Sequence, residues 1–185
     1  MARRDAVAFT EFVAARSPAL FRTAYLMVGD HGLAQDLVQE ALTKTYVAWP
    51  RLREVSKAEA YTRKAITTTY ISWWRRKAWA AERPRDDVPE GGLASEAGHD
   101  SGVVDRAWVW SELQSLPPRQ RAAIVLRYYE DLTEAQTAEA MGCAVGTVKS
   151  QVAQGIRRLR EQMGADAADL LPHDTVFTNY EAVQG

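Results

Sequence analysis

Polar and basic side chains recur at helical spacing near the C-terminal end of this 185-residue chain. Short groups come first, at Thr147 and Ser150, and guanidinium groups follow at Arg157 and Arg158. The full candidate set is Gly146, Thr147, Lys149, Ser150, Gln154, Arg157 and Arg158. Short donors and acceptors can read base edges while cations neutralise phosphates. This face therefore predicts a helix that enters a DNA groove.

The sequence around this face predicts two helices joined by a tight turn over residues 133–160. Thr133 and Gln136 form a capping box at the start of the first helix. Gly142 can adopt the left-handed conformation that ends it. The second helix begins near Val145 and carries one apolar stripe: Val145, Val148, Val152, Ile156 and Leu159. The alternative to DNA binding is a purely structural group of helices whose solvent-exposed face is basic. The short glycine turn favours a helix-turn-helix.

Aromatic and basic residues also alternate over residues 61–77, which predict a long helix. Trp73 and Trp74 cannot both face a core, because neighbours on a helix diverge by about 100°. Exposed aromatic surface among cations suits stacking on unpaired bases with phosphates held alongside. The alternative is that Trp73 is core and Trp74 lies under arginine stems, and composition alone does not decide. The candidate set is Arg63, Lys64, Thr68, Tyr70, Trp73, Trp74, Arg75 and Arg76.

Residues with catalytic or metal-binding spacing are scarce. His31, His99 and His173 lie far apart, without metal-ligand spacing. Neither a phosphate-binding glycine loop nor a nucleophile elbow is present. Asp36 and Glu40 lie one helical turn apart, but no further ligand converges on them, so a solvated or partner-facing surface is favoured. We therefore expect no catalytic residues, no metal and no cofactor.

Charge is distributed unevenly, although 23 basic and 24 acidic residues leave a net charge of −1. Residues 51–77 contain eight basic and two acidic side chains, whereas residues 82–100 contain six acidic and two basic ones. Basic modules separated by an acidic stretch fit separate binding patches for a polyanion.

The single cysteine, Cys143, excludes an intrachain disulfide and suits a reducing compartment. The N-terminal residues lack the apolar segment of a secretory signal. No apolar run approaches the length of a membrane span. We expect a cytoplasmic protein without membrane insertion.

Residues typical of helix starts and helix ends occur along the first half of the chain. Ser17 and Pro18 predict a helix start, and Gly29 its end. Asp30 can cap the next helix, which Pro50 terminates. The residues that follow the three-to-four-residue repeat of that helix are Leu33, Leu37, Val38, Ala41, Leu42, Thr45, Tyr46 and Trp49.

A second capping box, Ser56 with Glu59, is expected before the 61–77 helix. No useful strand alternation occurs anywhere. The predicted fold is all-α, with two small helical domains, a bundle over 5–79 and a helix-turn-helix domain over 104–163. A flexible acidic linker rich in glycine and proline joins them over 80–103. A short C-terminal tail covers 164–185.

Three blocks, in order, resemble the extracytoplasmic-function sigma factors, the small two-domain members of the bacterial sigma family. They are DHGLAQDLVQEALTKTYVAW (30–49), AYTRKAITTTYISWWRR (60–76) and the stretch from LPPRQR to GIRRLR (116–160). The chain is most similar to an actinobacterial SigE-like subgroup.

The resemblance implies a promoter-specificity subunit of bacterial RNA polymerase, with nucleotide addition left to the polymerase. Asp36, Leu37, Gln39 and Glu40 would face the clamp helices of the largest polymerase subunit. The loop 52–58 would capture a flipped base of the −10 element. The 63–76 set would hold the melted −10 strand, and the 146–158 set would read the −35 duplex.

Further partners are implied by the same resemblance. The second domain would contact the flap of the second-largest polymerase subunit, and the acidic linker would thread the polymerase cleft. An anti-sigma protein is a candidate partner, covering the 30–49 helix or wedging between the domains.

Two residues depart from the family pattern. Thr68 stands where the family usually has Asn, and a hydroxyl offers fewer hydrogen bonds than an amide. Ala144 stands where a Ser or Thr usually caps the recognition helix, a loss of about 1 kcal/mol.

Two other functions remain open from the sequence alone. One is a polymerase-independent helix-turn-helix regulator, which would not need the 30–49 helix or the 73–76 block. The other is a degenerate sigma-fold interaction protein, although its basic face would not need to be intact.

Overall fold

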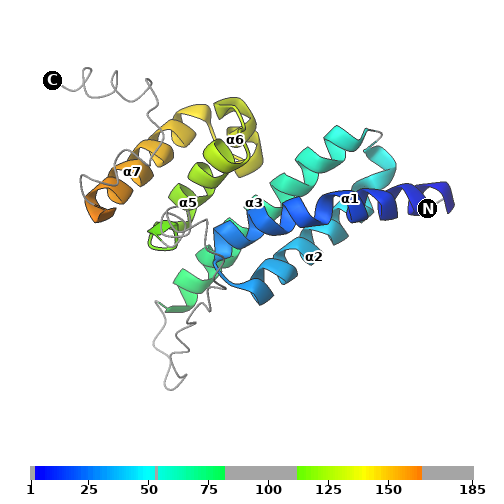
Figure 1. Ribbon diagram of the computed structural model, residues 1–185, viewed down its shortest axis with the longest axis horizontal. Coiled ribbons are helices and arrows are strands. Elements are labelled where there is room, and N and C mark those ends of the chain that lie inside the picture. Colours follow the sequence, from blue (N-terminus) through cyan, green and yellow to red (C-terminus); the bar gives the residue numbers. More distant parts are fainter. Residues whose placement is uncertain (1–2, 53, 82–111, 164–185) are drawn as a thin grey trace, which may run out of the picture.

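The computed structural model describes residues 3–52, 54–81 and 112–163, and every regular element in these ranges is a helix (Figure 1). The elements are α1 (Arg3–Val28), α2 (His31–Ala48), the 3₁₀ turn η1 (Trp49–Arg51) and α3 (Val55–Ala81). They continue with α5 (Pro118–Ile124), the π-helical segment η2 (Val125–Tyr129), α6 (Glu134–Met141) and α7 (Val145–Met163). The predicted all-α class is confirmed.

Helices α1, α2 and α3 form the first unit. Gly29, at φ 73°, makes the turn between α1 and α2, and the Asp30 carboxylate caps α2 by accepting from the Leu33 N–H at 2.8 Å, as predicted. Between α2 and α3 the buried hydroxyls of Thr45 and Thr62 lie 2.8 Å apart.

The predicted helix start at Ser17 is wrong, because α1 runs without a break from Arg3 and holds Pro18 in its interior. An interior proline costs a helix about 3 kcal/mol. The cost is offset by packing upstream of it: Phe12 is buried and its ring lies 5.3 Å from that of Trp49. The N-terminal half of α1 is thus fixed by tertiary contacts.

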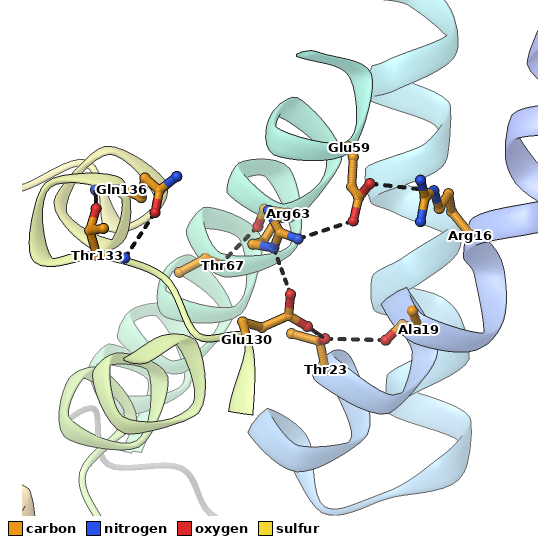
Figure 2. Close-up of polar contacts among 9 residues, drawn as sticks. All are labelled: Arg16, Ala19, Thr23, Glu59, Arg63, Thr67, Glu130, Thr133 and Gln136. Atoms are coloured by element: carbon orange, nitrogen blue, oxygen red, sulfur yellow. Dashed lines mark hydrogen bonds and ion pairs between the residues drawn. The ribbon is translucent and has the colours of Figure 1, made fainter. Parts of the chain in front are cut away.

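The predicted capping box at Ser56 and Glu59 is also wrong. Helix α3 begins at Val55, where the Glu54 carbonyl accepts from the Ala58 N–H, so Ser56 lies inside the first turn. Glu59 instead forms ion pairs with Arg16 and Arg63 (Figure 2). At its other end α3 reaches Ala81, beyond the predicted helix end at Lys77.

Helices α5, α6 and α7 form the second unit, and its predicted caps are confirmed. Thr133 and Gln136 make both bonds of the capping box, and Gly142 ends α6 at φ 63°. Gly155 lets α7 cross close to α5, because a Cβ there would lie 2.6 Å from the Ile124 side chain.

The helix that begins at Pro118 changes type at Val125, where η2 adopts π-helical hydrogen bonding up to the Glu130 N–H. Asp131 then takes a left-handed conformation, at φ 51°. Such π segments often mark functional positions, and this one aims Tyr129 and Glu130 at the first unit.

The two units pack against each other, with α5 and α6 lying against α3 (Figure 1). Buried side chains of both units, such as Met27, Tyr70 and Leu126, belong to one continuous core. Most of the predicted linker 80–103 and all of the predicted tail 164–185 lie outside the described residues, so the domain boundaries stay predictions.

Candidate nucleic-acid interface

Helix α7 has the two faces that its sequence predicts. Val148, Val152, Ile156 and Leu159 are buried against the second unit, whereas Val145 at the helix start is exposed. On the opposite face Gly146 and the long polar residues Lys149, Gln154, Arg157 and Arg158 are exposed, and the short polar residues Thr147 and Ser150 are half-buried. All seven predicted residues therefore lie on one helix, away from its core-facing stripe.

The contacts on this face are weak. Lys149 lies 3.4 Å from the Glu134 carboxylate, and Arg157 lies 3.9 Å from that of Glu161. Exposed pairs of this kind contribute about 0–1 kcal/mol. Exchanging them for phosphate contacts costs little, so the cations of α7 are available to a polyanion.

The N-terminal end of α7 lacks a side-chain cap. The Ala144 carbonyl accepts from the N–H groups of Thr147 and Val148, at 3.0 and 3.2 Å, but its methyl group accepts nothing. A Cβ on Gly146 would meet no atom within 4 Å. An uncapped helix N-terminus with open space attracts a phosphate through its N–H groups and dipole.

The predicted residues of α3 are distributed over surface and core. Lys64, Arg75 and Arg76 are exposed, and Thr68, Trp73 and Trp74 are half-buried. Arg63 retains 16% of its side-chain exposure because it pairs with Glu59 and Glu130. Both tryptophans are partly exposed, as expected of at least one. Both also pack against the core, so the expectation that the two cannot both face it is wrong.

Tyr70 lies in the core of this arrangement. Its side chain has no exposed surface, and its ring meets that of Trp74 edge-on at 6.5 Å. Its hydroxyl has no hydrogen-bond partner among the described residues. Burial raises the pKa of Tyr70 well above its usual value, so the phenol is neutral. Contact between Tyr70 and DNA would require the neighbouring helices to move.

Two cations lie over the ring of Trp74. The Lys77 ammonium lies 5.0 Å from the ring centre, and the Arg121 guanidinium, which comes from the second unit, lies 5.9 Å from it. Burial lowers the pKa of Arg121, but its carbonyl contacts and charge delocalisation keep it a cation. Sequence reasoning missed Arg121, because no local pattern shows that α5 meets α3.

The helical repeat places some of the predicted polymerase-binding residues of α2 on its surface and one in the core. Asp36 and Gln39 are exposed and Glu40 is half-buried, whereas Leu37 is fully buried and does not lie on this surface. The hydrogen bond from Lys44 to Glu40, 2.8 Å long, lowers the pKa of that carboxyl. Lys44 also donates to Thr69 at 2.7 Å, which ties α2 to α3.

Apolar side chains extend this surface, contrary to the sequence expectation that Leu33 and Tyr46 face the core. Leu33 and Tyr46 are exposed, as is Val47, which keeps 75% of its surface. Leu33, Asp36, Glu40 and Val47 are separated by three, four and seven residues, so they share one face of α2. The spacing of these residues can be read from the sequence. The sequence does not show where the buried face of α2 ends and its exposed face begins.

A cavity of about 470 Å³ lies between α1 and the loop expected to capture a base. Phe12, Trp49 and Leu52 supply its apolar wall. Its charged lining consists of Asp5, Glu11, Glu54 and Arg16. Carboxylates repel phosphate but accept from the amino groups of bases. The role of this loop stays a prediction.

The described residues contain no cluster of His, Cys, Asp or Glu that could hold a metal ion. His31 lies beside the ring of Phe21, while His99 and His173 are outside the described ranges. Burial raises the pKa of the free thiol of Cys143, which disfavours the reactive thiolate. None of the described helices is both long enough and apolar enough to cross a bilayer.

Two family descriptions match the two units. "Sigma-70 region 2" matches residues 12–80, and "Sigma-70, region 4" matches residues 106–159.

Similar proteins span nearly the whole chain. The RNA polymerase sigma-E factor of Streptomyces avermitilis is 36% identical over 163 residues, covering 88% of this chain and 89% of the relative. That of Streptomyces coelicolor is 36% identical over 165 residues, covering 89% and 91%. Among solved structures, the sigma factor RpoE of Bartonella quintana, in complex with the anti-sigma factor NepR, has the same fold. Its TM-score is 0.61 at 24% identity, over 84% of this chain and 96% of that one.

The helical fold with its basic α7 face, the two matching regions and the full-length relatives agree with one another. The chain therefore belongs to the extracytoplasmic-function sigma factors of the SigE-like type, which are promoter-specificity subunits of bacterial RNA polymerase.

Proposed function

We propose that this sigma factor divides promoter recognition between its two units: α3 holds the melted −10 strand and α7 reads the −35 duplex. The observation that carries the proposal is the pairing on α7 of a buried apolar stripe with an opposite face of Lys149, Gln154, Arg157 and Arg158. Thr147 and Ser150 offer short polar groups near the N-terminal end of that face. Such an order suits base edges first and phosphates further along.

The exposed cations of α3 support the proposed role of this helix in holding the −10 strand. Lys64, Arg75 and Arg76 flank the half-buried rings of Trp73 and Trp74. Unstacking a base costs a few kcal/mol. Stacking on an aromatic ring returns about 1–3 kcal/mol per base, and phosphate contacts add to it. Thr68 contributes one hydroxyl, which donates to the Lys64 carbonyl at 2.8 Å.

The exposed face of α2 is our proposed contact with the clamp helices of the largest polymerase subunit. Asp36, Gln39 and Glu40 suit a partner helix that carries arginines, since charge-assisted bonds to carboxylates are strong and directional. Leu33 and Val47 add apolar area at the two ends of this face. The second unit would contact the flap of the second-largest subunit.

An anti-sigma protein is a further partner that we propose, and the same α2 face is its target. The Bartonella relative was solved with such a protein, and a competitor for α2 would prevent polymerase binding directly. We also propose that the protein works in the cytoplasm, where polymerase and chromosome are found.

Run-off transcription tests the proposed function. The purified chain is added to core polymerase on a pool of bacterial promoter fragments. A double variant, Arg157→Ala with Arg158→Ala, is assayed in parallel because it lacks two cations of α7. Discrete transcripts that depend on the chain, and that weaken with the variant, are expected.

Other outcomes separate the alternatives. A stable core complex without transcripts would instead indicate a titrating sigma-fold protein. Tight sequence-specific duplex binding without any core binding would indicate a polymerase-independent regulator.

A further inference from the structure

The side-chain amide of Gln154 on α7 meets that of Gln120 on α5. Gln120 Nε2 donates to Gln154 Oε1 at 3.1 Å. The carbonyl of Gln154 is therefore turned towards α5. Its Nε2 group, which carries two N–H donors, donates to none of the residues that the structure describes. Since Gln154 is exposed, this group is available to a ligand of the polar α7 face.

The close approach of α5 and α7 makes this contact possible (Figure 1). A Cβ at Gly155 would lie 2.6 Å from the Ile124 side chain and 3.3 Å from Cβ of Gln120. A larger residue at this position would push the two helices apart, because protein interiors are close-packed. Gln120 is only 4% exposed and reaches Gln154 from the buried side of α7.

Gln120 carries an amide at a position where packing does not require one. Its Oε1 is buried and has no hydrogen-bond partner among the described residues. A buried oxygen without a partner destabilises the folded state, and a leucine of similar size would avoid that loss. The bond to Gln154 is the one hydrogen bond that the Gln120 side chain makes within the described ranges. Orientation of the Gln154 amide is therefore the effect that distinguishes glutamine from an apolar residue at position 120.

That orientation decides what Gln154 can recognise in a DNA groove. A glutamine that recognises adenine uses both arms of its amide, since the oxygen accepts from N6 and the nitrogen donates to N7. With its oxygen turned towards α5, Gln154 offers only donors. The matching edges in the major groove are those of guanine, with acceptors at N7 and O6, and of thymine, with an acceptor at O4.

We infer that Gln120 is a positioning residue that sets the base preference of Gln154. Held by Gln120, the Gln154 amide donates to guanine or thymine and does not form the two-bond contact with adenine. The base preference rests on the proposed reading of the −35 duplex by α7, whereas the orientation of the amide does not.

Exchange of side-chain amide protons with water tests the orientation without DNA. It is measured by nuclear magnetic resonance on the isotopically labelled full chain. Both Nε2 protons of Gln154 are expected to exchange about as fast as those of Gln39, an exposed glutamine of α2, because neither is hydrogen-bonded. Exchange of one Gln154 proton about tenfold more slowly than in Gln39 would mean that Gln154 is the donor to Gln120. That result would overturn the inference.

Base preference is measured on the polymerase-bound form. The full chain is combined with core polymerase, and its affinity is measured for promoter fragments from the run-off assay with all four bases at each −35 position. Gln154→Ala identifies the contacted position as the one where discrimination between bases is lost. There the unaltered chain is expected to prefer guanine or thymine to adenine by about tenfold.

Gln120→Leu tests the positioning role. The freed Gln154 amide can rotate and contact adenine as well, so the preference over adenine is expected to fall to within about threefold. A merely structural role would lower the affinity for all four bases alike and leave their ratio unchanged. Thr137→Val is the matched control, because it also replaces a buried polar atom of the second unit that has no partner among the described residues. It should not change the ratio, and urea unfolding checks that both variants remain folded.

Three results would overturn the base preference: adenine preferred at the contacted position, an unchanged ratio in Gln120→Leu, or equal losses on every sequence in Gln154→Ala. The last would assign Gln154 to a phosphate. If the unaltered polymerase-bound chain shows no preference at any −35 position, the proposed reading by α7 fails together with the base preference. Amide exchange in the free chain then still decides how Gln120 orients Gln154.

Discussion

The Arg121 guanidinium of the second unit lies over the ring of Trp74 in the first, 5.9 Å from its centre. Cation–π contacts of this kind contribute about 0.5–2 kcal/mol. The same ring is our proposed platform for a base of the melted strand. A protein group thus occupies one face of a ring that we propose as a contact for nucleic acid.

Replacing both tryptophans of α3 tests that platform. Trp73→Ala with Trp74→Ala is expected to leave core polymerase binding intact and to block open-complex formation, because the melted strand loses its stacking surface. Permanganate reactivity of thymines near the start site measures melting, and co-elution with core measures binding. Tyr61→Ala, an exposed aromatic of the same helix, is the matched control. Unchanged thymine reactivity in the double variant would contradict the assignment.

The α7 residues should fall into two groups. Arg157→Ala is expected to weaken binding to all −35 sequences alike and to reduce the salt slope by about 1, as the loss of one phosphate contact does. Changes at Lys149 or Ser150 should alter sequence preference, by about 1–3 kcal/mol per base contact. Fluorescence anisotropy on a panel of duplexes at several salt concentrations measures both effects. Arg160→Ala is the control, and equal losses on every sequence for all variants would disprove the division.

Tyr70 should make the protein sensitive to alkali. Its pKa is raised by burial, so above about pH 10 the unfolded chain releases a proton that the folded chain retains. Folded stability from this group is complete below that pH and falls as pH rises, by at most about 1.4 kcal/mol per pH unit.

Tyr70→Phe is expected to remove this loss and to change stability at pH 7 by less than about 1 kcal/mol, since the hydroxyl has no partner. Urea unfolding at pH 8 and pH 10.5 gives the comparison. All other residues are identical in the two proteins, so the difference between them isolates Tyr70. A parallel decline in the two proteins would show that Tyr70 is not the group responsible.

Gly29 and Gly142 form a natural pair for comparison. Both have positive φ, at 73° and 63°, so an alanine at either position should cost about 1–2 kcal/mol of backbone strain. Only at Gly29 would the new Cβ also meet the Gln114 side chain, at 2.5 Å, whereas nothing lies within 4 Å of Gly142.

Gly29→Ala should therefore be the more destabilising change, by about 1 kcal/mol or more for the displaced hydrogen bonds. Urea unfolding of both variants and of the unaltered protein measures the two losses in stability. Equal losses would show that Gln114 relocates freely.

Local signals sufficed where the physical cause is local. The Asp30 cap and the Thr133–Gln136 capping box depend on residues three positions apart, and each is present. The α7 stripe depends on the helical period alone, and its central members are buried as predicted. The resemblance to the sigma family likewise rests only on the order of residues in three blocks of the sequence.

Local signals failed where distant packing competes with them. Ser17 and Pro18 have the form of a helix start, but Phe12 upstream gains a partner in Trp49 and the helix continues through the proline. Leu33 and Tyr46 fit the apolar rhythm of α2, yet the first unit has core on only one side of that helix. Periodicity reveals that a stripe exists, and the neighbouring helices decide how wide the buried part is.

The sequence by itself determined the helical class, the caps of α2 and α6, the two faces of α7 and membership of the sigma family. The tertiary structure alone decided that Glu130 meets Arg63, 67 positions away in the chain, and that Arg121 reaches Trp74. The physical reason is that helix caps and helical periods are set by neighbours along the chain. Contacts between the units depend instead on which surfaces the packed helices leave to each other.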